Sequence, residues 1–289
     1  MSPLIRVWGV RISLHPFFVI IMMTSLLTGH FIELITLFAI VFIHECGHAA
    51  AAALLGCRVQ SIQMLPFGGV AVIEDGGKLT AYREIAIALA GPLQNLLMVG
   101  MVILLRYFQM GDPVFLDYVI QANMLIALFN LLPVLPLDGG KIVQALVSLW
   151  APYYITLMWS YRISILCSAG VILVAFSRWF AGDYGLPLNI LLIGLFLFYS
   201  NVTDYRNVPY RFIRFLMNRE AVFVRHAAAG SLAQPIISFP AKPLDTILRL
   251  LKRERYHMVY VMNKQGRVMA VLPEQRVIGS YFQQNMDKR

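Results

Sequence analysis

Charged side chains are scarce in this chain of 289 residues: they make up 13% of it, whereas hydrophobic residues make up 59%. Soluble globular domains carry about 25% charged residues, so this composition and the mean hydropathy of +0.69 exclude an ordinary soluble domain. The few charges are unevenly spread. Residues 1–204 hold nine Lys and Arg against ten Asp and Glu, and residues 205–289 hold fifteen against five. The asymmetry predicts a membrane domain followed by a basic, water-facing domain.

Cysteine is scarce as well. The three cysteines, Cys46, Cys57 and Cys167, form no C-x-x-C pair, and a cytoplasm-facing site argues against disulfides, so all three are expected to be free thiols. A cleavable signal peptide is not expected, because the first apolar stretch is too long and lacks an A-x-A-like exit. No aromatic residues alternate with the basic residues of the tail, so direct nucleic-acid binding is not expected.

Long apolar runs are what the sequence does have. Six of them are candidate spans of a bilayer that is roughly 30 Å thick. Lys and Arg concentrate in the segments that lie on the same side of the membrane as the N-terminus. The positive-inside rule therefore predicts that both termini are cytoplasmic. The predicted spans are residues 13–28, 31–55, 85–107, 114–134, 157–180 and 186–201.

The second apolar run contains the pattern H-E-x-x-H at His44, Glu45 and His48. At about 3.6 residues per turn, the two histidines project from one face of a helix, one turn apart, and can bind one metal ion. Glu45 lies about 100° round the helix, where its carboxylate can act as a general base on a water molecule without becoming a ligand. An acid within a membrane span costs about 3 kcal/mol, so it is rarely kept without a function. The pattern predicts one catalytic zinc ion.

Catalytic zinc usually takes a third protein ligand, and Asp138 is the best candidate. It follows the fourth apolar run in the segment N-L-L-P-V-L-P-L-D-G-G at residues 130–140. The prolines break the helix and the glycines permit close backbone approach, so function explains this irregular segment better than packing does. Glu74, Asp75 and Glu84 are the alternatives, although a turn or the membrane interface accounts for each of them as solvated surface.

The two motifs together resemble the site-2 protease family of intramembrane zinc metalloproteases, over essentially the whole chain. The resemblance implies that His44, His48 and Asp138 are the zinc ligands and that Glu45 is the catalytic acid and base. Six spans with a cytoplasmic tail are most similar to the sporulation branch of the family. That branch implies a sigma-factor precursor as substrate, inhibitory membrane-protein partners, and a location in the membrane that surrounds the forespore.

Asn130 and Pro136 match further positions of the family motif, which makes them candidate substrate-binding residues. Asn130 could hold the oxyanion or the substrate backbone. An Asn beside a helix break could equally satisfy carbonyl groups that the break sets free. Both interpretations stay open at this point.

Residues 59–73 predict a β-hairpin around Gly68 and Gly69. A transmembrane helix must unwind before it can be cleaved, and an exposed strand edge can bind the extended segment by β-augmentation. Gly68, Gly69 and Val70 are therefore candidate substrate-binding residues. The alternative is a hairpin that only connects two spans.

The tail predicts its own small domain. A helix is expected over residues 243–255, strands over 258–262 and 267–272, and a short helix over 273–282. This β-α-β-β-α order is similar to one cystathionine-β-synthase-type repeat. Such repeats often bind adenine nucleotides such as ATP and usually work in pairs. The single copy therefore predicts either a homo-oligomer, which is the simpler interpretation, or a degenerate module.

We therefore predict a mainly α, polytopic membrane protein with about six transmembrane helices, a membrane-associated β-hairpin and a C-terminal α/β domain. The predicted domains are residues 1–204 for the membrane metalloprotease, 205–225 for a linker and 226–289 for a regulatory domain. The predicted function is a zinc endopeptidase in the cell membrane that cleaves a membrane-associated or transmembrane protein near the cytoplasmic face. The alternatives are a metal transporter, which would need ligands along several spans, and an inactive binding scaffold.

Overall fold

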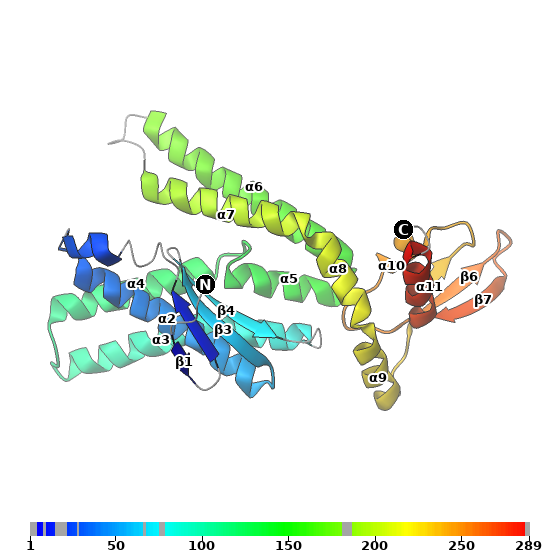
Figure 1. The fold of residues 1–289 in the computed structure, drawn as a ribbon, viewed down its shortest axis with the longest axis horizontal. Coiled ribbons are helices and arrows are strands. Elements are labelled where there is room, and N and C mark those ends of the chain that lie inside the picture. The colour runs from blue at the N-terminus through cyan, green and yellow to red at the C-terminus, as the bar shows by residue number, and fades with distance from the viewer. Residues whose placement is uncertain are drawn as a thin grey trace. The chain divides into compact units, whose positions relative to one another are not determined.

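The computed structural model describes residues 5–7, 10–14, 22–27, 29–65, 68–74, 79–180 and 187–286 (Figure 1). Contacts divide the chain into two compact units. The first unit comprises residues 1–75 and 82–142, and the second comprises residues 76–81 and 143–289.

Three long helices form most of the first unit: α2 (Phe31–Leu54), α3 (Ala81–Tyr107) and α4 (Pro113–Asn130). The start of α4 is well defined, because the Asp112 side chain accepts a hydrogen bond from the Phe115 N–H and a proline occupies the first helical position. A short turn joins α3 to α4, so the two helices run in opposite directions.

A four-stranded sheet completes the first unit, with the order β1-β2-β3-β4. Strands β3 and β4 are antiparallel and β2 runs parallel to β3. Among the described residues, β4 therefore pairs on one side only. Strands β3 and β4 contact α2, as Figure 1 shows. The hairpin predicted for residues 59–73 is confirmed. The bounds are β1 Ile5–Val7, β2 Val10–Leu14, β3 Arg58–Leu65 and β4 Gly68–Glu74.

The predicted helix break after α4 is also confirmed, and α5 (Asp138–Trp150) begins at the candidate aspartate. The backbone folds back closely over the break. A Cβ added at Gly139 would lie 2.1 Å from the Leu131 carbonyl oxygen, and one added at Gly140 would lie 2.5 Å from the Leu135 nitrogen. Glycine is therefore required at both positions, and the tight turn fixes the direction in which Asp138 points.

The second unit begins with a hairpin of two long helices and ends in a small α/β module. A hydrophobic core that includes Phe212, Leu248 and Val259 holds the module together. Its sheet has the order β5-β6-β7, with β5 parallel and β7 antiparallel to β6. The elements are α6 Tyr153–Phe180, α7 Leu188–Arg206, α8 Val208–Met217, α9 Arg219–Ala229, β5 Gln234–Ser238, α10 Leu244–Leu248, β6 His257–Met262, β7 Val268–Pro273 and α11 Glu274–Met286.

The β-α-β-β-α order predicted for the tail is confirmed, but the helix expected over residues 243–255 is wrong in length, because α10 ends at Leu248. A buried guanidinium explains the difference. Arg219 donates to both carboxylate oxygens of Glu274, at 2.9 and 2.7 Å. It also donates to the carbonyl groups of Lys252, Arg253 and Arg255. These contacts hold the segment after α10 in a non-helical path.

Five helices are long and apolar enough to cross a membrane among the residues that the structure describes: α2, α3, α4, α7 and residues 153–177 of α6. In the apolar 18-residue segment of each helix, only 17% to 33% is buried. Most of these side chains therefore face outward, as side chains in contact with lipid do. The helices match five of the six predicted spans. The first predicted span is wrong at its start, because Ser13 and Leu14 lie in β2 and pair with β3. Residues 22–27 are helical, and residues 15–21 lie outside the described part.

Candidate metal centre

Three side-chain atoms from two helices converge in the first unit. His44 and His48 lie one turn apart on α2, with their Nε2 atoms 3.1 Å from each other. The Oδ2 atom of Asp138, at the start of α5, lies 3.1 Å from the Nε2 of His44 and 3.0 Å from that of His48. All three residues are buried. The helix period thus sets the histidine pair, and the break after α4 brings the carboxylate to it.

The other ring nitrogens indicate which tautomers the histidines adopt. His48 Nδ1 lies 2.7 Å from the Ile87 carbonyl oxygen, and His44 Nδ1 lies 2.5 Å from the Asn95 Oδ1. Both Nδ1 atoms therefore donate, which leaves a lone pair on each Nε2. Two lone pairs and a carboxylate oxygen at this spacing repel each other unless a cation lies among them. Zinc–ligand bonds of 2.0–2.1 Å imply tetrahedral edges of about 3.3 Å, so these residues fit a zinc ion.

Glu45 lies beside this cluster and also contacts the sheet. One of its carboxylate oxygens lies within 4.8 Å of a ring nitrogen of each histidine. Its Oε2 accepts a hydrogen bond from the Ala71 N–H on β4, at 3.1 Å. A Cβ added at Gly69 would lie 2.3 Å from the Glu45 Cγ. Glycine at position 69 therefore lets the strand approach this carboxylate, which faces both the metal cluster and β4.

The second carboxylate oxygen of Asp138 is also held. Its Oδ1 accepts from the Lys141 ammonium at 3.0 Å, one turn along α5. Of the alternative acids, Glu84 lies in the first turn of α3. The Glu74 side chain and Asp75 fall outside the described part of the chain.

The candidate substrate-binding residues lie at the end of α4, in the break before α5, and in β4. Asn130 is the last residue of α4, and its Nδ2 donates to the Ile126 carbonyl at 3.0 Å. This contact favours the interpretation in which the Asn130 NH₂ group satisfies a carbonyl of its own helix. The Asn130 Oδ1 remains an acceptor. Pro136 lies half-buried in the break before α5. Gly68, Gly69 and Val70 open strand β4.

Sequence reasoning missed the contribution of α3. This helix supplies the Ile87 carbonyl and Asn95 to the two histidines, and it passes them at Gly91, where an added Cβ would lie 2.3 Å from His48 Nε2. Asn95 in turn contacts Asn123 of α4, and both amides are fully buried. An uncharged but polar side chain within an apolar span was the available signal, because such groups are usually kept for a function.

An H-E-x-x-H histidine pair and a carboxylate that converge among membrane-spanning helices define an intramembrane zinc metalloprotease. The chain belongs to Peptidase family M50, the site-2 proteases: the family's model matches residues 32–115 and 107–166. Stage IV sporulation protein FB of Bacillus subtilis is 30% identical over 282 residues, which are 96% of this chain and 93% of that protein. A zinc metalloprotease of Methanocaldococcus jannaschii is 29% identical over 283 residues, which cover 93% of this chain and 77% of that one.

A solved structure agrees on the fold. The site-2 protease from Methanocaldococcus jannaschii superimposes with a TM-score of 0.56 at 24% identity, over 70% of this chain and 94% of that one. The predicted family and class of enzyme are thus confirmed: the chain is a multi-pass membrane protein and an intramembrane zinc metalloprotease. The alternative of a metal transporter is not favoured, because the named relatives are zinc metalloproteases.

Proposed function

We propose that this chain is an endopeptidase that holds one zinc ion through His44, His48 and Asp138 and uses Glu45 as its catalytic acid and base. The convergence of the two Nε2 atoms and the Asp138 Oδ2 within 3.1 Å supports this assignment most strongly. The substrate is a membrane-associated or transmembrane protein that is cleaved near the cytoplasmic face.

When bound, the zinc ion supplies a Lewis acid for the scissile carbonyl and for a water molecule. The chain supplies the proton transfers. Without substrate, the Glu45 Oε2 accepts a hydrogen bond from the Ala71 N–H. During catalysis the Glu45 carboxylate takes a proton from the attacking water and passes it to the leaving amine. Lys141 holds the Oδ1 of Asp138, so that the Oδ2 stays directed at the histidines.

The open edge of β4 is the proposed binding surface for an unwound substrate segment. Because the Ala71 N–H points to Glu45 and not to β3, the alternation of an antiparallel ladder turns the N–H groups of Val70 and Val72 toward β3. Gly69 and Ala71 then pair with the substrate, with Val70 between them, and Gly68 opens the strand. A substrate carbonyl that accepts the Ala71 N–H would also release the Glu45 carboxylate for catalysis.

The proposed substrate is a sporulation sigma-factor precursor, and the whole-length similarity to a sporulation protein supports this choice. The same similarity supports inhibitory membrane-protein partners and a location in the membrane that surrounds the forespore. The distribution of Lys and Arg supports cytoplasmic termini. The charge asymmetry also supports a domain boundary near residue 204. The further division into residues 205–225 and 226–289, and a first span before residue 28, stay predictions, and Phe212 and Arg219 within residues 205–225 pack into the module.

The decisive experiment is cleavage of a candidate precursor by the purified chain in proteoliposomes, read by product size on a gel. The Glu45→Gln variant should bind zinc and cleave at least about 10²-fold more slowly, because an amide cannot accept the water's proton. Glu84→Gln is the matched control and should cleave at the wild-type rate. Normal cleavage by Glu45→Gln would contradict the assignment of the base.

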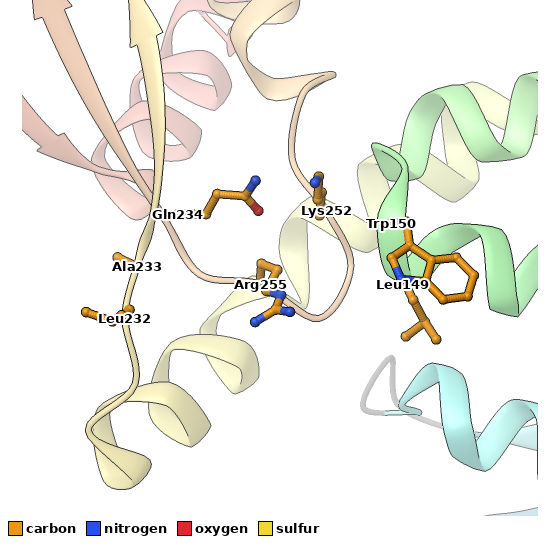
Figure 2. Close-up of a pocket in the computed structure, with 7 residues that line it drawn as sticks. All are labelled: Leu149, Trp150, Leu232, Ala233, Gln234, Lys252 and Arg255. Atoms are coloured by element: carbon orange, nitrogen blue, oxygen red, sulfur yellow. The ribbon is translucent and has the colours of Figure 1, made fainter.

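For the C-terminal module we propose a regulatory role like that of a cystathionine-β-synthase-type repeat, with an adenine nucleotide as ligand and a second copy as partner. A cavity of about 330 Å³ within the second unit supports a nucleotide (Figure 2). Its wall combines an indole ring, on which a base can stack, with two cations for phosphate. The lining residues are Leu149, Trp150, Leu232, Ala233, Gln234, Lys252 and Arg255.

Calorimetry with ATP on the detergent-solubilised chain tests this regulatory proposal. Lys252→Ala should weaken binding, whereas Lys264→Ala, in the exposed β6–β7 turn, should not. Light scattering of the same samples gives the number of copies. A chain that is monomeric and gives no heat with ATP would contradict both parts.

A further inference from the structure

We propose that Asn95 and Asn123 are positioning residues that fix the tautomer of His44, so that its Nε2 keeps a lone pair for the metal. The proposal rests on the zinc site described above and explains how that site is prepared. Its evidence is a chain of three hydrogen bonds that begins at a backbone carbonyl of α4 and ends at His44.

A neutral imidazole carries its proton on either ring nitrogen, and only the form with a proton on Nδ1 can bind a metal through Nε2. His48 is fixed in this form directly, because a carbonyl oxygen can only accept and Ile87 supplies one at 2.7 Å. His44 faces an amide instead. Asn95 could present either its oxygen or its NH₂ group to Nδ1, since an amide can be turned over within the same space.

Asn123 decides which way Asn95 points. Asn123 Nδ2 donates to the Val119 carbonyl at 2.9 Å, so its Oδ1 faces Asn95 and accepts from the Asn95 Nδ2 at 3.1 Å. The Asn95 Oδ1 is therefore the atom that meets His44 Nδ1, at 2.5 Å. The Val119 carbonyl cannot donate, so turning over both amides would set two acceptors against each other at that end of the chain. The Val119 carbonyl group therefore determines which atom donates and which accepts in all three hydrogen bonds.

Packing alone does not account for this arrangement. Polar side chains often join membrane helices, and the Asn95–Asn123 bond would serve that purpose between α3 and α4. That role does not require the Asn95 oxygen to lie 2.5 Å from a ring nitrogen of His44. Both amides are fully buried, so each must satisfy its groups within the protein. Their shared orientation links the fold of two helices to the protonation of one metal-binding ring.

The test measures zinc affinity by competition with a chromophoric chelator, on the full chain purified in detergent. Asn95→Leu should bind zinc about 10- to 100-fold more weakly, the usual effect of removing a group that orients a metal ligand. Asn95→Asp should restore binding, because a carboxylate can only accept and holds the same tautomer. Asn201→Leu is the matched control, since Asn201 is also a buried amide within a span. It should leave the affinity unchanged.

A double-mutant cycle separates positioning from stability. Asn123→Leu should weaken zinc binding in the wild-type background, because the Asn95 amide is then free to turn over. It should have no effect in the Asn95→Asp background. Both carboxylate oxygens accept, so turning the substituted side chain over still presents an acceptor to His44. The visible spectrum of the cobalt-substituted protein should change with Asn95→Leu and return to the wild-type form with Asn95→Asp.

Three results would overturn the inference: wild-type zinc affinity in Asn95→Leu, equal losses in Asn95→Asp and Asn95→Leu, or an equal loss in Asn201→Leu. These outcomes differ from failure of the proposed function. In that case the wild-type chain would itself bind no zinc, and both proposals would fall.

Discussion

The clearest structural test of the metal centre is the substitution Gly91→Ala on α3. An added methyl carbon would lie 2.3 Å from the Nε2 of His48 and 2.7 Å from the Cε1 of His44, whereas ordinary contact begins at 3.4 Å. The His48 ring would have to move by 3.4 minus 2.3, or 1.1 Å, unless α3 itself moves. Metal–ligand distances tolerate only about 0.2 Å. The variant should therefore lose bound zinc and cleavage together.

Helix stability should not cause this loss, because alanine favours a helix over glycine by about 1 kcal/mol. The matched control is Gly100→Ala on the same helix, where an added methyl group meets nothing within 4 Å. Zinc per chain, measured by mass spectrometry after gel filtration, and cleavage in proteoliposomes give the result. If Gly91→Ala kept full zinc and wild-type cleavage, the close approach of α3 to the histidines would be refuted.

Three further predictions follow from other contacts. Asp138→Ala should lose zinc in the same metal analysis and Glu84→Ala should retain it; the reverse would identify a different third ligand. Ala71→Pro removes the N–H at the open edge of β4 and should strongly lower cleavage with zinc retained, whereas Val72→Ala should stay active; wild-type cleavage by the proline variant would make the hairpin a plain connector. Burial lowers the pKa of His257 in the C-terminal module, so the unfolded chain takes up a proton near pH 6.5 before the folded chain does. The thermal midpoint of the module should therefore fall as the pH drops below about 6.5, and an unchanged midpoint at about pH 5.5 would contradict this.

The sequence by itself determined the features that depend on local periodicity. His44 and His48 share one face because a helix repeats every 3.6 residues, whatever the rest of the chain does. The long apolar runs identified five of the membrane helices, because the thickness of a bilayer sets their length. Glycines 68 and 69 indicated a hairpin. The motif at residues 130–140 indicated a broken helix, because proline lacks the N–H that a helix requires.

Only the tertiary structure decided which distant groups meet. Asp138 lies 90 residues beyond His48 in the chain, yet its Oδ2 is 3.0 Å from that ring. The motif at residues 130–140 favoured Asp138 over Glu84, but no local pattern could place its carboxylate beside the two histidines. The roles of Asn95 and Asn123 depend on how α3 and α4 pack, and Ser13 lies in a strand because it pairs with β3. Contacts between distant segments have no period that a sequence can display, so they become visible only when the chain is folded.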